Sequence, residues 1–289
     1  MSNGIAVRQN EEKAIAMLAT QRQLYNDAKK FGAISVVLSV WLPFAMALIL
    51  LFLPEESIWK SVSYILAIVS MLFSFVVDKH IADKKKLAAF IQQKFDVHVY
   101  NMPWNERIFG KDKNVNQEIV AYSKQIIENA DEKERLYNWY TPAVDNWDLS
   151  TGILLCQREN FWWDVGLRKR YRLVSVIMIV FLCSLVLVMG LWKNESVAML
   201  LWRFAFIVPM LEWLFDTVKT LNKDMERLKE LDEIINNDVP KTMDELQDIQ
   251  RMIFEHRKEC YAIPNFIYQI FKDNDEDTAR RVISIENSD

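Results

Sequence analysis

The fold of this chain is set by the stretch LVSVIMIVFLCSLVLVMGLWKNESVAMLLWRFAFIVPMLEWLF, residues 173–215. It contains two apolar segments, residues 173–192 and 197–215, separated by a short polar link. A second pair, residues 33–53 and 58–77, lies nearer the N-terminus. Each segment has 19 to 21 residues, close to the ~20 that a helix needs to cross ~30 Å of hydrocarbon. The pattern predicts an all-α membrane protein with four transmembrane helices in two hairpins.

The two predicted hairpins divide the chain of 289 residues into five parts. Residues 1–32 are predicted to form an amphipathic cytoplasmic helix that runs straight into the first hairpin, residues 33–77. Residues 78–172 form a mainly helical cytoplasmic domain, and residues 173–215 form the second hairpin. Residues 216–289 form a helical cytoplasmic tail with an acidic, disordered end.

Local patterns predict the elements of the aqueous parts. Residues 95–100 alternate between apolar and polar side chains, as a short strand does, and residues 116–137 have a helical pattern. The tail has a heptad seam over residues 218–235 and an amphipathic helix over residues 243–261. These two tail helices either fold back on each other or pair between subunits.

The distribution of charge predicts the orientation in the membrane. Basic clusters flank the apolar segments at residues 84–86 and 168–172, whereas the short links 54–57 and 193–196 carry little positive charge. The positive-inside rule therefore places both termini and the middle domain in the cytoplasm. Residues 216–289 contain 11 basic and 18 acidic residues, which argues against DNA as a partner.

Motifs of catalysis and metal binding are absent from the sequence. The chain has no H-E-x-x-H, C-x-x-C or G-x-S-x-G motif, and it has only 6 glycines and 3 histidines. We therefore expect no enzyme activity, no metal and no cofactor. The alternative of a membrane enzyme acting on lipids or phosphates would draw on Asp145, Asp148, Asp164 and His98, but no spacing supports it.

The fourth apolar segment contains two ionisable residues, Arg203 and Glu212. They are nine residues apart, which places them on opposite faces of a helix. Either both lie near the ends of the segment and extend toward the interface, or at least one lines a water-filled pore built by several subunits. Pro43 and Pro209 also lie within apolar segments, where they either kink the helices or serve packing.

A second unusual feature is the mixture of arginine and aromatic residues in residues 136–142 and 156–171. Arginine matches phosphate oxygens, and aromatic faces stack on bases, so the mixture suits a nucleotide ligand. The alternative is an aromatic belt with a basic anchor at the membrane surface. The candidate ligand-binding residues are Tyr137, Trp139, Arg158, Asn160, Trp162, Trp163, Asp164, Arg168, Arg170 and Tyr171.

Several of these stretches match a known family. They are Arg8-Gln9-Asn10, Gln21-Arg22, Leu136-Tyr137-Asn138-Trp139-Tyr140, Cys156-Gln157-Arg158, and Asn160 with Trp162-Trp163-Asp164, Leu167-Arg168 and Arg170-Tyr171. Together with the layout of two plus two hydrophobic segments, they make the chain resemble the SMODS-associating four-transmembrane effectors of bacterial anti-phage systems. The resemblance runs from the N-terminus through the fourth segment.

The resemblance implies a role in the bacterial inner membrane. A partner nucleotidyltransferase senses infection and makes a cyclic nucleotide or oligonucleotide. The effector responds by oligomerising and permeabilising the lipid bilayer, and the infected cell stops growing. A separate hypothesis is a membrane scaffold that recruits cytosolic partners through its C-terminal helices.

Overall fold

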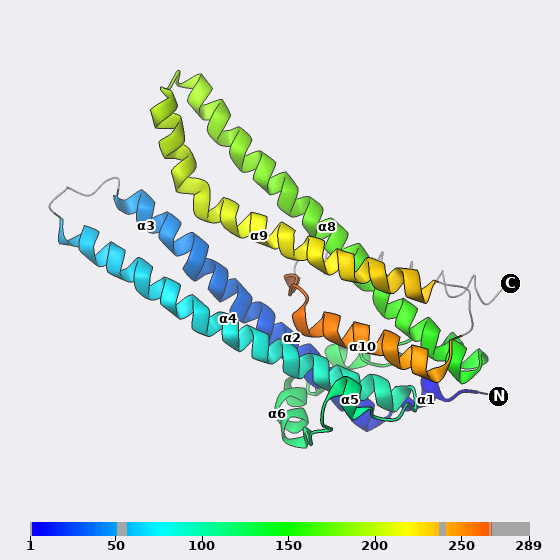
Figure 1. Ribbon diagram of the computed structural model, residues 1–289. Coiled ribbons are helices and arrows are strands. Elements are labelled where there is room, and N and C mark those ends of the chain that lie inside the picture. Colours follow the sequence, from blue (N-terminus) through cyan, green and yellow to red (C-terminus); the bar gives the residue numbers. More distant parts are fainter. Residues whose placement is uncertain (1, 51–56, 237–240, 266, 268–289) are drawn as a thin grey trace.

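The computed structural model describes residues 2–50, 57–236, 241–265 and 267. Within these ranges every regular element is a helix (Figure 1). The all-α prediction is therefore confirmed for the described residues. The N-terminal helix α1 spans Ile5–Arg8 and precedes the two hairpins.

The first hairpin begins with α2, Glu12–Val36, which continues through the π-helical turn η1, Val37–Trp41, into α3, Leu42–Leu50. Its second arm is α4, Ile58–Val99. The π turn lies just before Pro43, which has no N–H group for the regular helical hydrogen bond. The prediction that the N-terminal helix runs directly into the first apolar segment is confirmed.

The second hairpin consists of α8, Leu149–Trp192, and α9, Val197–Ile235. The axis of α9 is bent by 58° between Ala205 and Ile207. Pro209 lies inside this helix, and a proline ring clashes with the carbonyl group four residues earlier, here that of Ala205. The structure thus favours the kink over a purely packing role for this proline.

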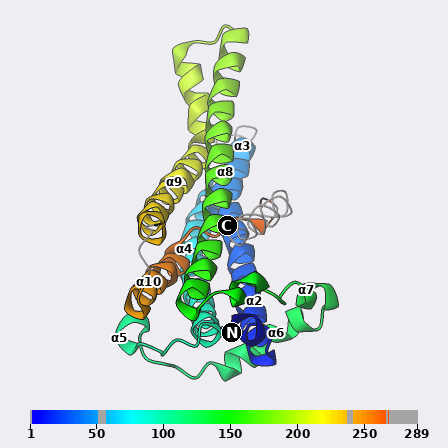
Figure 2. The same cartoon turned by 90° about the vertical axis from the view of Figure 1, so that its right-hand side faces the viewer.

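Short helices connect the two hairpins. They are α5, Glu106–Phe109, α6, Asn116–Ile127, α7, Ala130–Glu134, and the 3-10 helix η2, Pro142–Asn146. The helix predicted over residues 116–137 is broken after α6, because the side chain of Asn129 accepts a hydrogen bond from the backbone of Glu132 and begins a new helix. Figure 2 shows α6 and α7 on one side of the body, beside α2.

The strand predicted over residues 95–100 is wrong, because α4 continues through Val99. Phe95 and Val99 are fully buried, and Val97 between them is also buried. A helix that is enclosed on most sides is apolar around much of its circumference. The alternation that suggested a strand therefore reflects the enclosure of α4 by the body.

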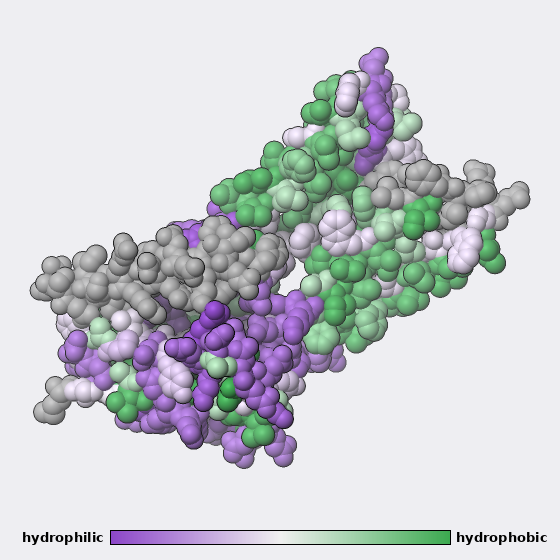
Figure 3. Space-filling view, turned by 180° about the vertical axis from the view of Figure 1, so that it is seen from behind, coloured by the Kyte–Doolittle hydropathy of each residue, from purple (hydrophilic) through white to green (hydrophobic). Residues whose placement is uncertain are grey.

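Among the described residues, three helices are long and apolar enough to cross a membrane, and the two arms of the bent α9 form a fourth candidate. Large apolar side chains are exposed along them; Leu191 is 81% and Trp192 86% exposed. Figure 3 shows apolar residues over the hairpins and polar residues over the body. Helices α4, α8 and, beyond its bend, α9 each continue from an apolar segment into the body.

The last described helix of the tail is α10, Met243–Glu259, which folds back against α9. Leu228, Leu231 and Ile235 of α9 pack with Ile249 and Ile253 of α10. The structure thus shows that the two tail helices fold back on each other within one chain. The acidic end predicted to be disordered, residues 274–289, lies outside the described residues.

Candidate functional site

Helix α10 lies where the two hairpins meet the body, in contact with α4, α8 and α9 (Figure 1). It begins with a capping box: the Thr242 hydroxyl accepts a hydrogen bond from the Glu245 backbone, and the Glu245 carboxylate accepts one from the Thr242 backbone. One face of the helix is apolar, but buried polar side chains lie on it as well. These polar side chains form two clusters, described below.

The first cluster is centred on Asp96 of α4, whose side chain is 0% exposed. Its carboxylate accepts hydrogen bonds from Arg257 Nη1 at 2.5 Å, Gln250 Nε2 at 2.8 Å and the Tyr140 hydroxyl at 2.6 Å. Burial works to lower the pKa of Arg257, but the adjacent Asp96 outweighs it, and this pKa lies above its ordinary value. Asp96 thereby joins the tail helix to the first hairpin through a buried ion pair.

The second cluster is centred on Arg168 of α8, which is 3% exposed. Its guanidinium donates from Nε to Asp164 at 2.9 Å and from Nη1 to Asp224 of α9 at 2.6 Å. His256 Nε2 of α10 lies 2.5 Å from the same Asp164 oxygen. The planar fork of arginine suits two carboxylates at once. The Arg168 cluster therefore ties α8, α9 and α10 together.

Amide side chains extend the Asp96 cluster toward α8 and the N-terminus. Gln157 Nε2 donates to the Leu246 carbonyl at 2.9 Å, and Asn160 Nδ2 donates to the Tyr140 hydroxyl at 2.9 Å. Gln9 forms two hydrogen bonds with the backbone of Tyr140, at 3.0 and 2.7 Å. Gln9, Gln157 and Asn160, which lie in stretches that carry the family resemblance, thus join the Asp96 cluster. We call the two clusters and these amides the α10 clamp.

The predicted ligand-binding residues do not form one open site. Asn160, Asp164 and Arg168 are engaged in the α10 clamp. Tyr171 is buried, with its ring 5.7 Å from that of Tyr261. The others differ in exposure: Tyr137 is 44% and Trp162 39% exposed, Trp139, Arg158 and Arg170 are half-buried, and the side chain of Trp163 lies outside the described residues. Ligand binding by this set stays a prediction.

The clamp also contains residues outside the predicted ligand-binding set. Besides Gln9 and Gln157, they are Asp96, Tyr140, Asp224, Gln250, His256 and Arg257. Two of these, Gln250 and Arg257, could have been found from the sequence. Gln250 and Arg257 are seven residues apart and therefore share a helix face with the apolar Ile253. A polar pair on an apolar face predicts a buried polar partner elsewhere in the chain.

The two candidate pore residues have different surroundings in the described chain. Arg203 donates from Nε and Nη2 to Glu195 in the link between α8 and α9, with both distances 2.5 Å. Glu212 lies beyond the bend in α9 and is exposed. The Arg203 charge is thus neutralised near the tip of the hairpin. Pore lining by either residue stays a prediction.

Comparison with known proteins connects this arrangement to a family. A family model described as SMODS-associating 4TM effector domain matches residues 3–284. The chain belongs to this family. A protein of Bacillus cereus (strain VD146) named "Probable CBASS effector molecule" is 23% identical over 286 residues, which cover 93% of this chain and 94% of the relative. No solved structure matches the chain significantly.

Family membership confirms the resemblance and extends it. The SMODS-associating 4TM effector match continues through residue 284 and so includes α10. The tail helix is therefore part of the effector domain. This agrees with its position in the α10 clamp, where it contacts both hairpins.

Proposed function

We propose that this effector assembles with copies of itself in the bacterial inner membrane and permeabilises it when a partner nucleotidyltransferase supplies a cyclic nucleotide or oligonucleotide. The observation that carries the proposal is the continuity of α4, α8 and α9 from apolar segments into a body closed by the α10 clamp. Family membership in a group associated with SMODS supports the nature of the signal.

In this proposal the α10 clamp holds the resting arrangement. The Arg257–Asp96 ion pair fixes α10 to the first hairpin, and the contact between His256 and Asp164 fixes it to the second. A signal that binds the open arrangement more tightly than the resting one shifts the population toward opening. Packed interfaces of this kind switch between discrete arrangements instead of deforming gradually. The response is a binding event and involves no chemical step.

Glu212, an exposed carboxylate within the fourth apolar segment, supports assembly. A charged side chain facing lipid at the centre of a span costs about 2.5–3.5 kcal/mol on insertion scales, and Glu212 is exposed in the single chain. Contact with another subunit or with a water-filled lumen would remove this cost. Four helices are too few to enclose a wide channel, so a lumen needs several subunits around an axis.

The direct test is leakage from liposomes. The purified full-length protein is reconstituted into vesicles that contain a small fluorescent dye, and cyclic di- and trinucleotides are added one at a time. We expect rapid dye release with one nucleotide and slow release without it. Protein-free vesicles with the same nucleotides are the control. If the reconstituted protein releases no dye with any nucleotide that it binds, the pore proposal is wrong.

A further inference from the structure

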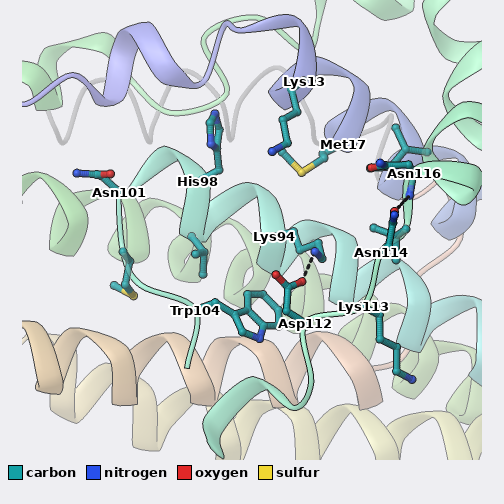
Figure 4. A pocket seen from close by; sticks show the side chains of 14 residues that line it. Lys13, Met17, Lys94, His98, Asn101, Trp104, Asp112, Lys113, Asn114 and Asn116 are labelled. Carbon is teal, nitrogen blue, oxygen red and sulfur yellow. Dashed lines mark hydrogen bonds and ion pairs between the residues drawn. The ribbon is translucent and has the colours of Figure 1, made fainter. Parts of the chain in front are cut away.

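A separate pocket of about 540 Å³ lies between α2, α4 and the segment of residues 101–116 (Figure 4). Its volume is within the range of about 300–1,000 Å³ that is typical of small-molecule sites. The floor is apolar: Met17, Val97, Met102 and Val115 are buried. An apolar floor with a few polar groups at the rim is the usual composition of a ligand site.

The rim of this pocket is positively charged. Lys13, Lys94 and Lys113 line it, and Asp112 is the one carboxylate among the lining residues. Lys94 Nζ pairs with Asp112 (Figure 4). His98 in the wall faces Glu11, with Nε2 and the carboxylate oxygen 2.7 Å apart. Three lysines against one lining carboxylate favour an anionic ligand.

An aromatic side chain is held beside the lysines. Trp104 donates from Nε1 to the Gly110 carbonyl at 2.9 Å, and its ring centroid lies 5.4 Å from that of Phe90 and 5.3 Å from that of Phe109. Lys94 Nζ lies 5.5 Å from the same centroid. A tryptophan face provides stacking for any nucleobase. Amide groups of Asn101, Asn114 and Asn116 line the same pocket and offer hydrogen bonds to base edges.

We propose that this pocket is a binding site for a phosphodiester-linked nucleotide, with its phosphate beside Lys94 and a base on Trp104. The inference rests on the proposed nucleotide trigger but places the ligand apart from the residues of the α10 clamp. In the resting state Asp112 forms an ion pair with Lys94. The ligand phosphate replaces this carboxylate beside Lys94. The exchange frees the segment that leads into α6, which packs on α2.

The position of the pocket explains how the signal would reach the membrane. Its walls are α2 and α4, the two helices that continue into the first hairpin. Lys94 follows the last residue of the second apolar segment, Val77, by 17 residues, or about 25 Å of helix. A lipid head group at the bilayer surface is therefore too distant, whereas a free cytosolic nucleotide can enter.

The test is a binding titration on full-length protein in detergent micelles with fluorescent cyclic di-AMP, cyclic GMP–AMP and cyclic tri-AMP. For the probe that binds, we expect Lys94→Ala and Trp104→Ala each to weaken affinity about tenfold, the loss of one charge-assisted or stacking contact. Asp112→Asn should instead tighten binding, because it removes the internal competitor. Lys13→Ala tests the exposed rim without disturbing packing. The matched control is Lys124→Ala on α6, whose side chain is 74% exposed.

The outcomes separate this inference from the proposed function. A probe that binds the wild type but is unaffected by Lys94→Ala, Lys13→Ala and Asp112→Asn overturns the site while leaving the pore proposal intact. The site is also overturned if none of the three probes binds the wild-type protein. Binding that depends on these residues, combined with vesicles that do not leak, supports the site and refutes the pore.

Discussion

Arg257 of α10 and Asp96 of α4 form a buried ion pair across 161 residues of sequence, with 2.5 Å between Nη1 and Oδ2. Asp96 is 0% exposed, so the pair is almost removed from solvent. It is one of the contacts that attach the last described helix to the first hairpin. The arrangement makes the position of the tail sensitive to one charge in the body.

Replacing Arg257 with Ala leaves the Asp96 carboxylate buried without its cation. Breaking a buried pair in this way costs about 3–5 kcal/mol, so we expect α10 to detach and basal dye leakage from vesicles to rise. Limited proteolysis should release a tail fragment earlier than in the wild type. The control is Lys229→Ala, which removes an exposed pair with Glu233. That change should alter stability by no more than about 1 kcal/mol, and unchanged protease sensitivity of the Arg257 variant would contradict the clamp.

Arg168→Lys distinguishes an arginine that holds helices together from a charge that attracts a ligand. Lysine keeps the charge but cannot contact Asp164 and Asp224 through a planar fork. We expect this variant to lower the thermal midpoint of the protein in detergent nearly as much as Arg168→Ala, with or without nucleotide. Arg170→Lys is the matched comparison on the same helix. If Arg168→Lys keeps the thermal midpoint of the wild type but no longer binds nucleotide, Arg168 is a ligand-binding residue instead.

Cys260, just after α10, reports on release of the tail. Burial raises the pKa of its thiol, so little reactive thiolate is present near neutral pH. In a protein that carries Cys156→Ala and Cys183→Ala, we expect slow maleimide labelling of Cys260. The Arg257→Ala change should accelerate the labelling, because the released thiol returns toward its ordinary pKa of about 8.5. Equal rates measured by mass spectrometry would show that the tail stays docked.

Pro209→Ala tests the bend in α9. Alanine restores the missing N–H group and removes the clash with the carbonyl group of Ala205, so the 58° bend should decrease. Spin labels placed at Val197 and Thr220 should lie farther apart in this variant than in the wild type, as measured by pulsed electron paramagnetic resonance. Leakage should fall if the bend shapes the pore. Pro142→Ala in η2, outside the hairpins, serves as the control substitution. An unchanged distance would show that the bend does not depend on proline.

Glu212 and Arg203 should have different effects on ion selectivity. Arg203 is already neutralised by Glu195, whereas Glu212 is exposed beyond the bend. We expect Glu212→Gln to reduce the preference for cations in planar bilayer recordings, since rings of carboxylates favour cations. Arg203→Gln should leave the reversal potential nearly unchanged. The opposite result would place Arg203 in the lumen and Glu212 outside it.

Much of the fold followed from local sequence patterns, and the errors have physical causes. The apolar segments and α10 were predictable because hydrophobic length and helical periodicity are local properties. The strand expected at residues 95–100 was wrong because α4 is enclosed by elements distant in sequence. Asp224 was missed because it lies on the heptad seam between Leu221 and Leu228, where a polar residue is tolerated only with a partner such as Arg168.

The sequence by itself determined that the chain has apolar helices long enough for a membrane, and which family it belongs to. Only the tertiary structure decided what the motif residues do: Gln157, Asn160 and Arg168 point into a buried network with α10, α4 and α9. It also brought Lys13, Lys94 and Trp104 around one pocket. The physical reason is that segment length and periodicity are encoded locally, whereas hydrogen-bond partners separated by 20 to 161 residues are fixed only by packing.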